Sequence, residues 1–466
     1  MREFLKSTTL VVLVALSVLQ MSLFIQQQTL GPQRFLKPVA AAAATAVGEE
    51  QLTRPPAELV TPPRVIAHLG GEKHALLRAS SGFYTNIWNN IWRSSIAKDK
   101  TMSFAAFKEV EHGRWDTVSP SVEMILSHPT PLDLWLRALG VKLEGVSGRV
   151  PVVNRIYVSA VEDNQIIIED IEIDRLYVMP VEFKAEILSK FLEVTAASVY
   201  YAQVPLSPKI FAIPFANPIY VYTKAPLVAP RQVEVEPTIE TDRLLTAYFP
   251  DPSMVRLYKD SQGNETYYDG VRMLKRLDGL RRLATLEDSS GVRSDAEDNP
   301  LLVMARWTTR LQQWAEGEVS FDGQQLQDNG EVVTYYQQAY QGKPVFRQGT
   351  AEGAIPTIRP SYTVRSEGDT LLGFERDTAK IGASGTHKEA LDAIFALAVV
   401  DDRWDTLFPG HARSEKKLRD IYEAFLVGSE PMASPVWCVE FYDGSKVLVD
   451  IYDSRVRGIM LPAVDR

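Results

Sequence analysis

The feature that most constrains this chain is an uncharged apolar run near its start, residues 8–25, which reads TTLVVLVALSVLQMSLFI. As a helix, this run extends about 27 Å, close to the ~30 Å hydrocarbon thickness of a bilayer. A helix is expected because a lone segment in lipid has to pair its own backbone groups. The run therefore predicts a single transmembrane helix over residues 8–25, preceded by a short cytoplasmic tail over residues 1–7.

Basic residues flank the run unevenly, since Arg2 and Lys6 precede it closely whereas Arg34 and Lys37 follow at a distance. The positive-inside rule then places the N-terminus in the cytoplasm and the bulk of the chain outside the cell membrane. The alternative is a cleaved signal peptide, for which residues 40–44 offer an A-x-A site. That site lies about fifteen residues beyond the apolar run, too far for ordinary cleavage, so we expect a retained single-pass anchor.

One face of the predicted helix carries a polar residue. Gln20 shares this face with Leu13, Ser17 and Phe24 at three- and four-residue spacing. An amide in hydrocarbon is costly unless it is paired, and a hydrogen bond to a neighbouring helix contributes about 0.6–2 kcal/mol. Leu13, Ser17, Gln20 and Phe24 are therefore the candidate contact with a transmembrane partner. The alternative is that Gln20 reaches the outer membrane interface.

The rest of the chain predicts an α+β protein, in which the transmembrane helix is followed by a multi-domain extracytoplasmic body of antiparallel sheets with packed helices. Residues 26–60 hold a Gln run, an Ala-rich stretch and two adjacent prolines, a composition typical of a flexible tether. The proline-rich stretch 226–237 and the polar run 322–330 indicate domain boundaries. We expect an N-terminal domain over 61–230, a middle domain (antiparallel meander plus helix) over 231–330 and a C-terminal domain over 331–466.

Hydrophobic periodicity and turn residues predict the elements. A hairpin is expected over 64–68 and 75–78, a meander over 254–259, 265–268, 272–277 and 281–286, and a final hairpin with strands at 436–442, 447–452 and 456–461. Further strands are expected at 155–159, 166–168, 176–178, 332–339, 344–347, 361–365 and 370–375. The expected helices are 83–96, 181–194, 243–249, 301–314, 386–400 and 414–426.

Charge and cysteine content exclude several classes of function. The chain has 50 Lys+Arg against 59 Asp+Glu, a formal net charge of −9, and so lacks the basic footprint of a nucleic-acid-binding protein. The single cysteine, Cys438, rules out an internal disulfide and a cysteine-rich zinc site. On a strand it faces away from Trp437, Val439 and Phe441, so we interpret it as an inert strand residue rather than a nucleophile.

No motif for catalysis or metal binding is complete. Residues 382–385 miss the G-x-S-x-G spacing by one position. His68 and His74 flank a Gly-Gly turn and can face the same way across a hairpin, but two ligands do not make a metal site. The acidic pairs 401–402 and 450/453 are interpreted as helix-end and turn residues. We therefore expect no catalytic residues, cofactor or metal, and a binding or regulatory module rather than an enzyme.

The alternative is an extracytoplasmic cell-wall enzyme or ligand-binding receptor, whose site is assembled from residues distant in sequence. Tyr335, Tyr336 and Tyr340 are its candidate contacts, because exposed aromatic rings can stack on sugars. Packing of these tyrosines within a strand is the preferred interpretation.

Three regions of the chain resemble the YycH (WalH) family. Residues 60–68 (VTPPRVIAH) resemble its opening strand, and residues 340–346 (YQGKPVF) match a later segment. The most specific segments, 245–256 (LTAYFPDPSMVR) and 266–274 (TYYDGVRML), are similar to the family pattern LF-x-DPS-x-V-R … TYTDG-x-R-x-L, with Tyr268 where the family has Thr. Residues 313–317 (QWAEG) replace a Gly-Gly-Trp signature, and the segment from Pro435 to Gly458 is similar to PepSY-like modules and to YycI.

The resemblance implies a membrane-anchored, non-catalytic regulator of the essential WalK (YycG) sensor histidine kinase of low-GC Gram-positive bacteria. This kinase belongs to the WalK/WalR (YycG/YycF) two-component system of cell-wall homeostasis. The implied partners are WalK and YycI (WalI), with a second copy of the chain as a further candidate, and no nucleic acid. The implied architecture is a three-part α/β body whose latter two parts resemble YycI.

Overall fold

The computed structural model describes most of the chain between residues 56 and 461 and, before that, only Arg34–Phe35. The described segments are 34–35, 56–70, 73–78, 93–96, 100–110, 120–161, 165–182, 184–195, 200–203, 211–215, 218–222, 226–235, 251–277, 282–286, 318–349, 355–367, 370–377, 379–428 and 430–461. Isolated described positions are 84, 85, 88, 163, 224, 245, 248, 249, 301 and 305.

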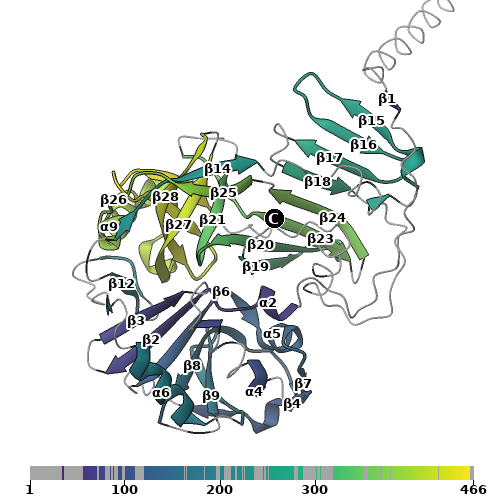
Figure 1. The fold of residues 1–466 in the computed structure, drawn as a ribbon. Helices are drawn as coiled ribbons and strands as arrows, with labels where there is room; N and C mark the ends of the chain where they lie inside the picture. Colours follow the sequence, from purple (N-terminus) through teal and green to yellow (C-terminus); the bar gives the residue numbers. More distant parts are fainter. Residues whose placement is uncertain are drawn as a thin grey trace, which may run out of the picture.

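The first half of the chain forms a nine-stranded antiparallel sheet in the order β12-β11-β3-β2-β6-β8-β9-β10-β5 (Figure 1). The expected hairpin is present, because β2 and β3 pair with His68 opposite His74. Helix α6 contacts β2, and α5 contacts α2 and β6. The strands are β2 (Arg64–Gly70), β3 (Lys73–Arg78), β5 (Lys108–Val110), β6 (Ser121–Pro131), β8 (Val152–Ser159), β9 (Gln165–Asp170), β10 (Arg175–Pro180), β11 (Tyr200–Gln203) and β12 (Tyr220–Tyr222). The smaller elements are α2 (Pro56–Leu59), α4 (Ser94–Ile96), η3 (Phe104–Ala106), α5 (Leu132–Ala138), α6 (Ala185–Thr195) and the parallel pair β4 (Thr101–Ser103) and β7 (Lys142–Glu144).

A second sheet begins with the expected meander and continues, at β18, into strands from later in the chain. Its order here is β15-β16-β17-β18-β24-β23-β20-β19, all antiparallel. The short strand β1 (Arg34–Phe35) pairs with β15 at the free edge. The strands are β15 (Arg256–Lys259), β16 (Glu265–Tyr268), β17 (Met273–Leu277), β18 (Arg282–Leu286), β19 (Glu318–Leu326), β20 (Val332–Tyr340), β23 (Tyr362–Glu367) and β24 (Thr370–Asp377), with η4 (Pro252–Met254) before β15.

The C-terminal part adds a twisted sheet in the order β21-β27-β28-β29-β30, covered by α9 (Figure 1). Strand β21 connects it to β20 and pairs with β27 in parallel. The elements are β13 (Leu227–Val228), β14 (Arg231–Val235), β21 (Lys343–Gln348), β22 (Ile358–Arg359), β25 (Ala379–Ser384), β26 (Lys388–Glu389), α9 (Ala393–Asp402), α10 (Trp404–Leu407), η5 (Arg413–Glu415), β27 (Leu418–Val427), β28 (Met432–Phe441), β29 (Lys446–Asp450) and β30 (Val456–Met460).

Strand alternation divides the C-terminal core into two faces. Trp437, Val439 and Phe441 pack with α9 and α10 on one face. Cys438 packs with Phe346 and other apolar residues on the opposite face, fully buried. The expected alternation is therefore confirmed. Burial, with a smaller contribution from the charge of Glu440, raises the pKa of the Cys438 thiol, which is protonated at neutral pH.

The helix expected at 414–426 is wrong. This segment holds the short η5 and then strand β27, which pairs with β21 on one side and β28 on the other. Leu418, Ile421 and Phe425 have helical spacing, but both faces of β27 are buried. A strand buried on both faces has a near-continuous apolar sequence, and periodicity then fails to separate strand from helix.

The other expected helices have mixed outcomes. The helix predicted over 181–194 is α6, Ala185–Thr195. The helix predicted over 386–400 begins later, at Ala393, because the Asp392 carboxylate accepts the Ile394 N–H at 3.0 Å and caps it. Most of the helices predicted over 83–96, 243–249 and 301–314 lie outside the described residues. Strand β6 and helix α5 were not predicted.

The described residues include no helix with both the length and the apolar character that a bilayer crossing needs. Residues 8–25 lie outside the described residues, and with them Leu13, Ser17, Gln20 and Phe24. The anchor, its candidate contact face and the domain boundaries therefore stay predictions, whereas the sheet-dominated α+β body is confirmed.

The burial of Cys438 predicts its reactivity. We expect a thiol-specific reagent to leave the native protein unlabelled at neutral pH and to label one thiol per chain after denaturation, since Cys438 is the only cysteine. Mass spectrometry measures the labelling. Fast stoichiometric labelling of the native protein would contradict the buried position.

Candidate functional site

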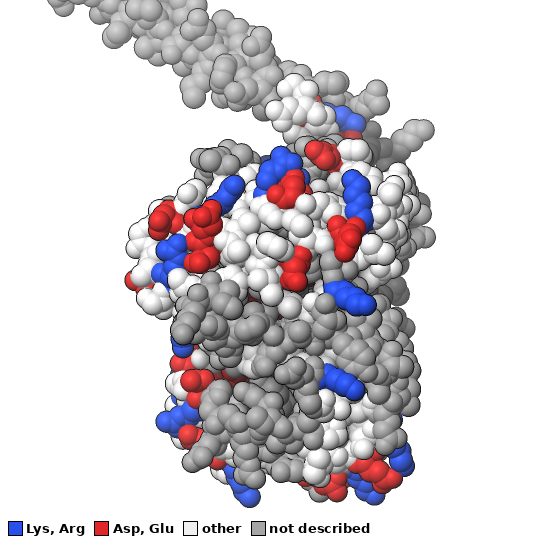
Figure 2. Space-filling model, turned by 90° about the vertical axis from the view of Figure 1, so that its left-hand side faces the viewer, with Lys and Arg blue, Asp and Glu red and all other residues white. Residues whose placement is uncertain are grey.

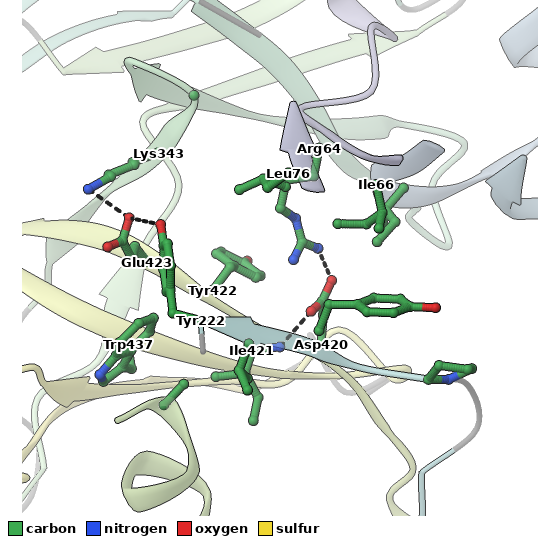
Figure 3. A pocket seen from close by; sticks show the side chains of 16 residues that line it. Arg64, Ile66, Leu76, Tyr222, Lys343, Asp420, Ile421, Tyr422, Glu423 and Trp437 are labelled. Atoms are coloured by element: carbon green, nitrogen blue, oxygen red, sulfur yellow. Dashed lines mark hydrogen bonds and ion pairs between the residues drawn. The ribbon is translucent and has the colours of Figure 1, made fainter. Parts of the chain in front are cut away.

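The nine-stranded N-terminal sheet and the C-terminal sheet meet where β27 faces β2, β6 and β12 (Figure 3). A cavity of about 50 Å³ lies there, lined by Arg64 and Ile66 of β2, Tyr222 of β12 and residues 420–423 of β27. Figure 3 shows Arg64 and Asp420 pointing toward each other from opposite sides of this cavity. Charged and aromatic residues make up half of the lining and apolar residues such as Ile66 and Ile421 most of the rest, so ion pairs and apolar packing lie side by side here.

Ion pairs bridge the sheets at this cavity. Arg64 pairs with Asp420, and its guanidinium carbon lies 4.5 Å from the ring centroid of Tyr422. The Lys343 ammonium, at the start of β21, lies 2.7 Å from the Glu423 carboxylate. Tyr222 donates its hydroxyl hydrogen to the same carboxylate at 3.1 Å. Each of these contacts joins β27 to another element.

Arg419, the residue before Asp420, makes the most extensive contact between the sheets. Its guanidinium donates to Asn154 Oδ1 at 2.8 Å and to the carbonyl oxygens of Ser127 and Leu126 at 2.9 and 2.6 Å, all on the N-terminal sheet. It also donates to Glu440 Oε1 at 2.8 Å on its own sheet. The residue is 1% exposed, so these bonds replace its hydration.

Arg155 of β8 extends the polar contact from the N-terminal side. It pairs with the buried Glu123 of β6 and donates to the carbonyl oxygens of Pro218 and Arg419, at 3.2 and 3.4 Å. Glu123 also lies 3.3 Å from His68 Nε2, and His68 Nδ1 lies 2.9 Å from His74 Nδ1. The two histidines thus face each other across the hairpin. No group of three metal-ligating side chains occurs among the residues that the structure describes.

Lys446 connects β19 to these ion pairs. Its ammonium lies 2.6 Å from Asp322 on β19 and 3.6 Å from Glu440 on β28. We call the whole set the charged junction: Arg64, Arg155, Arg419 and Lys446 with Glu123, Asp322, Asp420 and Glu440. Four cations thus meet four carboxylates. On the face that Figure 2 shows, by contrast, described residues of both signs are interspersed over the surface.

Burial and neighbouring charges shift the pKa values of several groups in the charged junction. Burial opposes the charge on Glu123 and Glu440, but Arg155 beside Glu123, and Arg419 and Lys446 beside Glu440, outweigh it and lower the pKa of both carboxyl groups. Burial likewise opposes the charge on Lys446, but Asp322 and Glu440 raise its pKa. Burial raises the pKa of Asp322, although Lys446 beside it acts in the opposite direction. The ion pairs of the junction connect strands of different sheets.

The residues considered as sites from the sequence are dispersed. Asp401 pairs with Arg413 at the end of α9, and Asp450 accepts the Tyr452 N–H in a turn, as interpreted. Of the three tyrosines considered as sugar contacts, Tyr336 is fully buried, which agrees with the preferred interpretation of packing within a strand. Tyr340 packs on Phe425, with ring centroids 6.2 Å apart.

Comparison with known proteins supports a single fold. No protein-family model matches the chain, and no curated protein matches it in sequence. The crystal structure of YycH from Bacillus subtilis matches with a TM-score of 0.56 at 13% identity, covering 87% of this chain and 97% of that one. This chain has the YycH fold. The fold expected from segments 60–68, 245–274 and 340–346 is therefore confirmed.

A weaker match adds nothing to the YycH fold. An uncharacterized protein from Eubacterium rectale matches with a TM-score of 0.35 at 10% identity, covering 56% of this chain and 94% of that one. The match to YycH, by contrast, covers 87% of this chain.

Removing Arg419 should destabilise the protein strongly. Arg419→Met removes one of the two cations beside Glu440 and the hydrogen bonds to Asn154 Oδ1 and to two backbone carbonyl oxygens. We therefore expect the free energy of unfolding to fall by about 3–5 kcal/mol. The matched control is Arg175→Met, whose arginine pairs with Glu109 at 2.9 Å with both side chains about half exposed. We expect it to cost less than about 1 kcal/mol. Urea denaturation measures both, and equal losses would contradict a holding role for the charged junction.

His128 should make stability depend on pH. It lines the junction beside β19, where a Cβ on Gly323 (φ +125°) would lie 3.1 Å from its ring. Burial, and then the charges of Arg419 and Lys446, lower its pKa to about 3, against about 6.5 in the unfolded chain. As the pH falls, the unfolded state therefore binds a proton at His128 before the folded state does. The contribution of uncharged His128 to the free energy of unfolding is complete above pH ~6.5. It is lost as the pH falls toward 3, by at most about 1.4 kcal/mol per pH unit.

His128→Gln tests this dependence. We expect the variant to lose stability less steeply than the wild type between pH 6.5 and 4 in urea denaturation. The control His411→Gln changes an exposed histidine and should leave the wild-type slope intact. A slope unchanged in His128→Gln would assign the acid sensitivity to other groups.

Proposed function

We propose that this protein is a membrane-anchored, non-catalytic regulator that modulates the WalK sensor histidine kinase together with YycI. The observation that carries the proposal is the YycH fold over 87% of this chain and 97% of YycH from Bacillus subtilis. The apolar run at residues 8–25 and the YycH-like segments support it from the sequence. In this proposal the run is a single membrane-spanning helix and the sheets lie outside the cell.

Two of the YycH-like segments meet beside the charged junction. Segment 60–68 contributes Arg64, which pairs with Asp420, and segment 340–346 contributes Lys343, which pairs with Glu423. Both partners lie on β27, three residues apart. The position of these two segments favours a function that depends on the relative arrangement of the sheets. Contact of a partner with one sheet is then transmitted to the other through paired charges.

The anchor supplies the proposed contact with the kinase. A helix that binds one state of a two-state kinase more tightly shifts the equilibrium toward that state. A coupling free energy of about 1–3 kcal/mol shifts it about 5- to 150-fold, with no chemistry by the regulator. Leu13, Ser17, Gln20 and Phe24 are the proposed contact face, and YycI is the proposed partner of the extracytoplasmic body.

Gln20→Leu tests the proposed contact. We expect the variant to co-purify with WalK from membranes several-fold less well than the wild type, because the hydrogen bond between helices is lost. It should also have a smaller effect on WalK autophosphorylation in proteoliposomes. The matched control is Gln28→Leu, the same change just beyond the apolar run. Equal retention of WalK by both variants would leave Gln20 outside the contact.

Two outcomes would contradict the function itself. One is wild-type protein that neither co-purifies with WalK or YycI nor changes WalK autophosphorylation. The other is lysis of peptidoglycan by the full chain in a zymogram, which would favour a cell-wall enzyme. A scrambled sequence over residues 8–25 that keeps its composition separates specific helix contacts from simple membrane attachment.

A further inference from the structure

Exposed apolar side chains gather at one end of the meander formed by β15, β16 and β17. Met254 of η4 is 63% exposed, Val271 in the β16–β17 turn is 56% exposed, and Tyr268 at the end of β16 is 38% exposed. Arg256, the first residue of β15, pairs with Tyr268, so η4, the end of β16 and the turn after it lie at the same end of the sheet. We call Met254, Tyr268 and Val271 the apolar tip.

The core of the meander does not include the apolar tip. Leu257, Tyr267 and Leu274 lie opposite one another on the three strands and pack in the core or against it. Because successive side chains of a strand point to opposite faces, Tyr268 lies on the other face of the sheet. An exposed cluster of large apolar groups is typical of a contact surface.

The two carboxylates nearest in sequence to the apolar tip accept hydrogen bonds from their own turns. Asp251 accepts the Ser253 N–H at 3.0 Å, and Asp269 accepts the Val271 N–H at 2.9 Å. These bonds offset part of the negative charge at this end of the meander. Arg256 is exposed and adds a positive charge there. A long arginine side chain can rest on an apolar surface while its guanidinium stays in water or meets a phosphate.

The path of the chain brings this end of the meander close to the membrane in the proposed topology. Strand β1 pairs with β15, with Phe35 opposite Arg256, and only nine positions separate Arg34 from residue 25, where the apolar run ends. Nine residues reach at most about 30 Å when fully extended, whereas a compact body of roughly 400 residues is about 55 Å across. The β15 edge therefore stays closer to the bilayer than the body is wide. Figure 1 shows the meander at the far side of the molecule from the N-terminal sheet.

We infer that the apolar tip inserts into the interface of the extracytoplasmic leaflet, as a second contact between this protein and the membrane. The inference rests on the membrane anchor of the proposed function. Met254 and Val271 then contact the acyl boundary. Tyr268 and Arg256 lie at the depth of the headgroups, where tyrosine rings and basic side chains are favoured.

The short connection to the anchor makes a small contact sufficient. Three side chains bind lipid weakly by themselves, but the connection holds them near the bilayer, and a weak contact gains strength when it is intramolecular. A single helix leaves the orientation of the body open. A second contact fixes which face of the body is turned toward a partner in the same membrane.

Lipid quenching in bilayer nanodiscs tests the inference with the full chain. The discs contain equal parts of phosphatidylcholine and phosphatidylglycerol, with a nitroxide-labelled lipid as quencher. Val271→Cys is labelled with an environment-sensitive fluorophore, while the buried Cys438 stays unlabelled. The matched control is Leu326→Cys, which is 70% exposed on β19, about 24 Å or five strand spacings from β17 in the same sheet. We expect several-fold stronger quenching of the label at position 271 than at position 326.

Met254→Asp, made together with Val271→Cys, probes the apolar tip itself. It places a charge beside the label, and a charge is costly where lipid replaces water. We therefore expect quenching of the label at position 271 to fall several-fold. Met254 is largely exposed, so misfolding is a minor risk. Leu326→Asp in the same labelled chain is the control and should leave the quenching unchanged, and thermal melting should show both variants folded.

Co-elution of the chain with the discs separates this inference from the proposed function. A chain that does not enter the discs would contradict the anchor, and with it both proposals. A chain that enters the discs but shows weak quenching at both positions would contradict the insertion of the apolar tip alone. Strong quenching at both positions, or quenching that Met254→Asp does not reduce, would assign the lipid contact to the label and would likewise overturn the inference.

Discussion

The arrangement of the two sheets depends on the guanidinium of Arg419. Its donors reach Asn154 and two backbone carbonyls on the N-terminal sheet, and Glu440 on the C-terminal sheet. A planar group with fixed donor directions accepts only one relative position of its partners. Apolar contacts are less selective, since they tolerate rotation and sliding of one surface over the other. Taking the charges out of water cancels much of their attraction, so the charged junction contributes more to specificity of docking than to stability.

The members of the charged junction are distributed over many strands. The charged junction contains residues of β2, β6 and β8 in the N-terminal sheet. It also contains residues of β19 in the second sheet and of β27, β28 and β29 in the C-terminal sheet. Its carboxylates form ion pairs with arginines and with Lys446. A displacement of β27 would therefore break several contacts together.

The sequence predicted local structure well and long-range structure poorly. Asp269-Gly270 and Asp443-Gly444 mark turns between short strands, and those strands formed as expected. Strand β27 was mistaken for a helix because a strand covered on both faces loses its period of two. The charged junction was not predicted, because Arg155 and the Arg419 carbonyl are 264 positions apart in the chain. The available signal was local, namely an arginine or glutamate within an apolar strand, such as Arg155 between Val153 and Ile156. Such a residue needs a partner, but its identity depends on the tertiary fold.

The separation between Arg419 and Asn154, 265 residues, also bears on how the molecule is made. A chain synthesised from its N-terminus completes β6 and β8 long before β27 exists. Glu123 and Arg155 neutralise each other early, being only 32 positions apart. The carbonyls of Leu126 and Ser127 and the Asn154 amide, however, stay hydrated until the last quarter of the polypeptide arrives. Closure of such a long loop is slow, so the newly made protein passes through a stage with its N-terminal sheet formed and its docking edge open. Premature proteolysis and mispairing during biogenesis are therefore expected to concentrate on that edge.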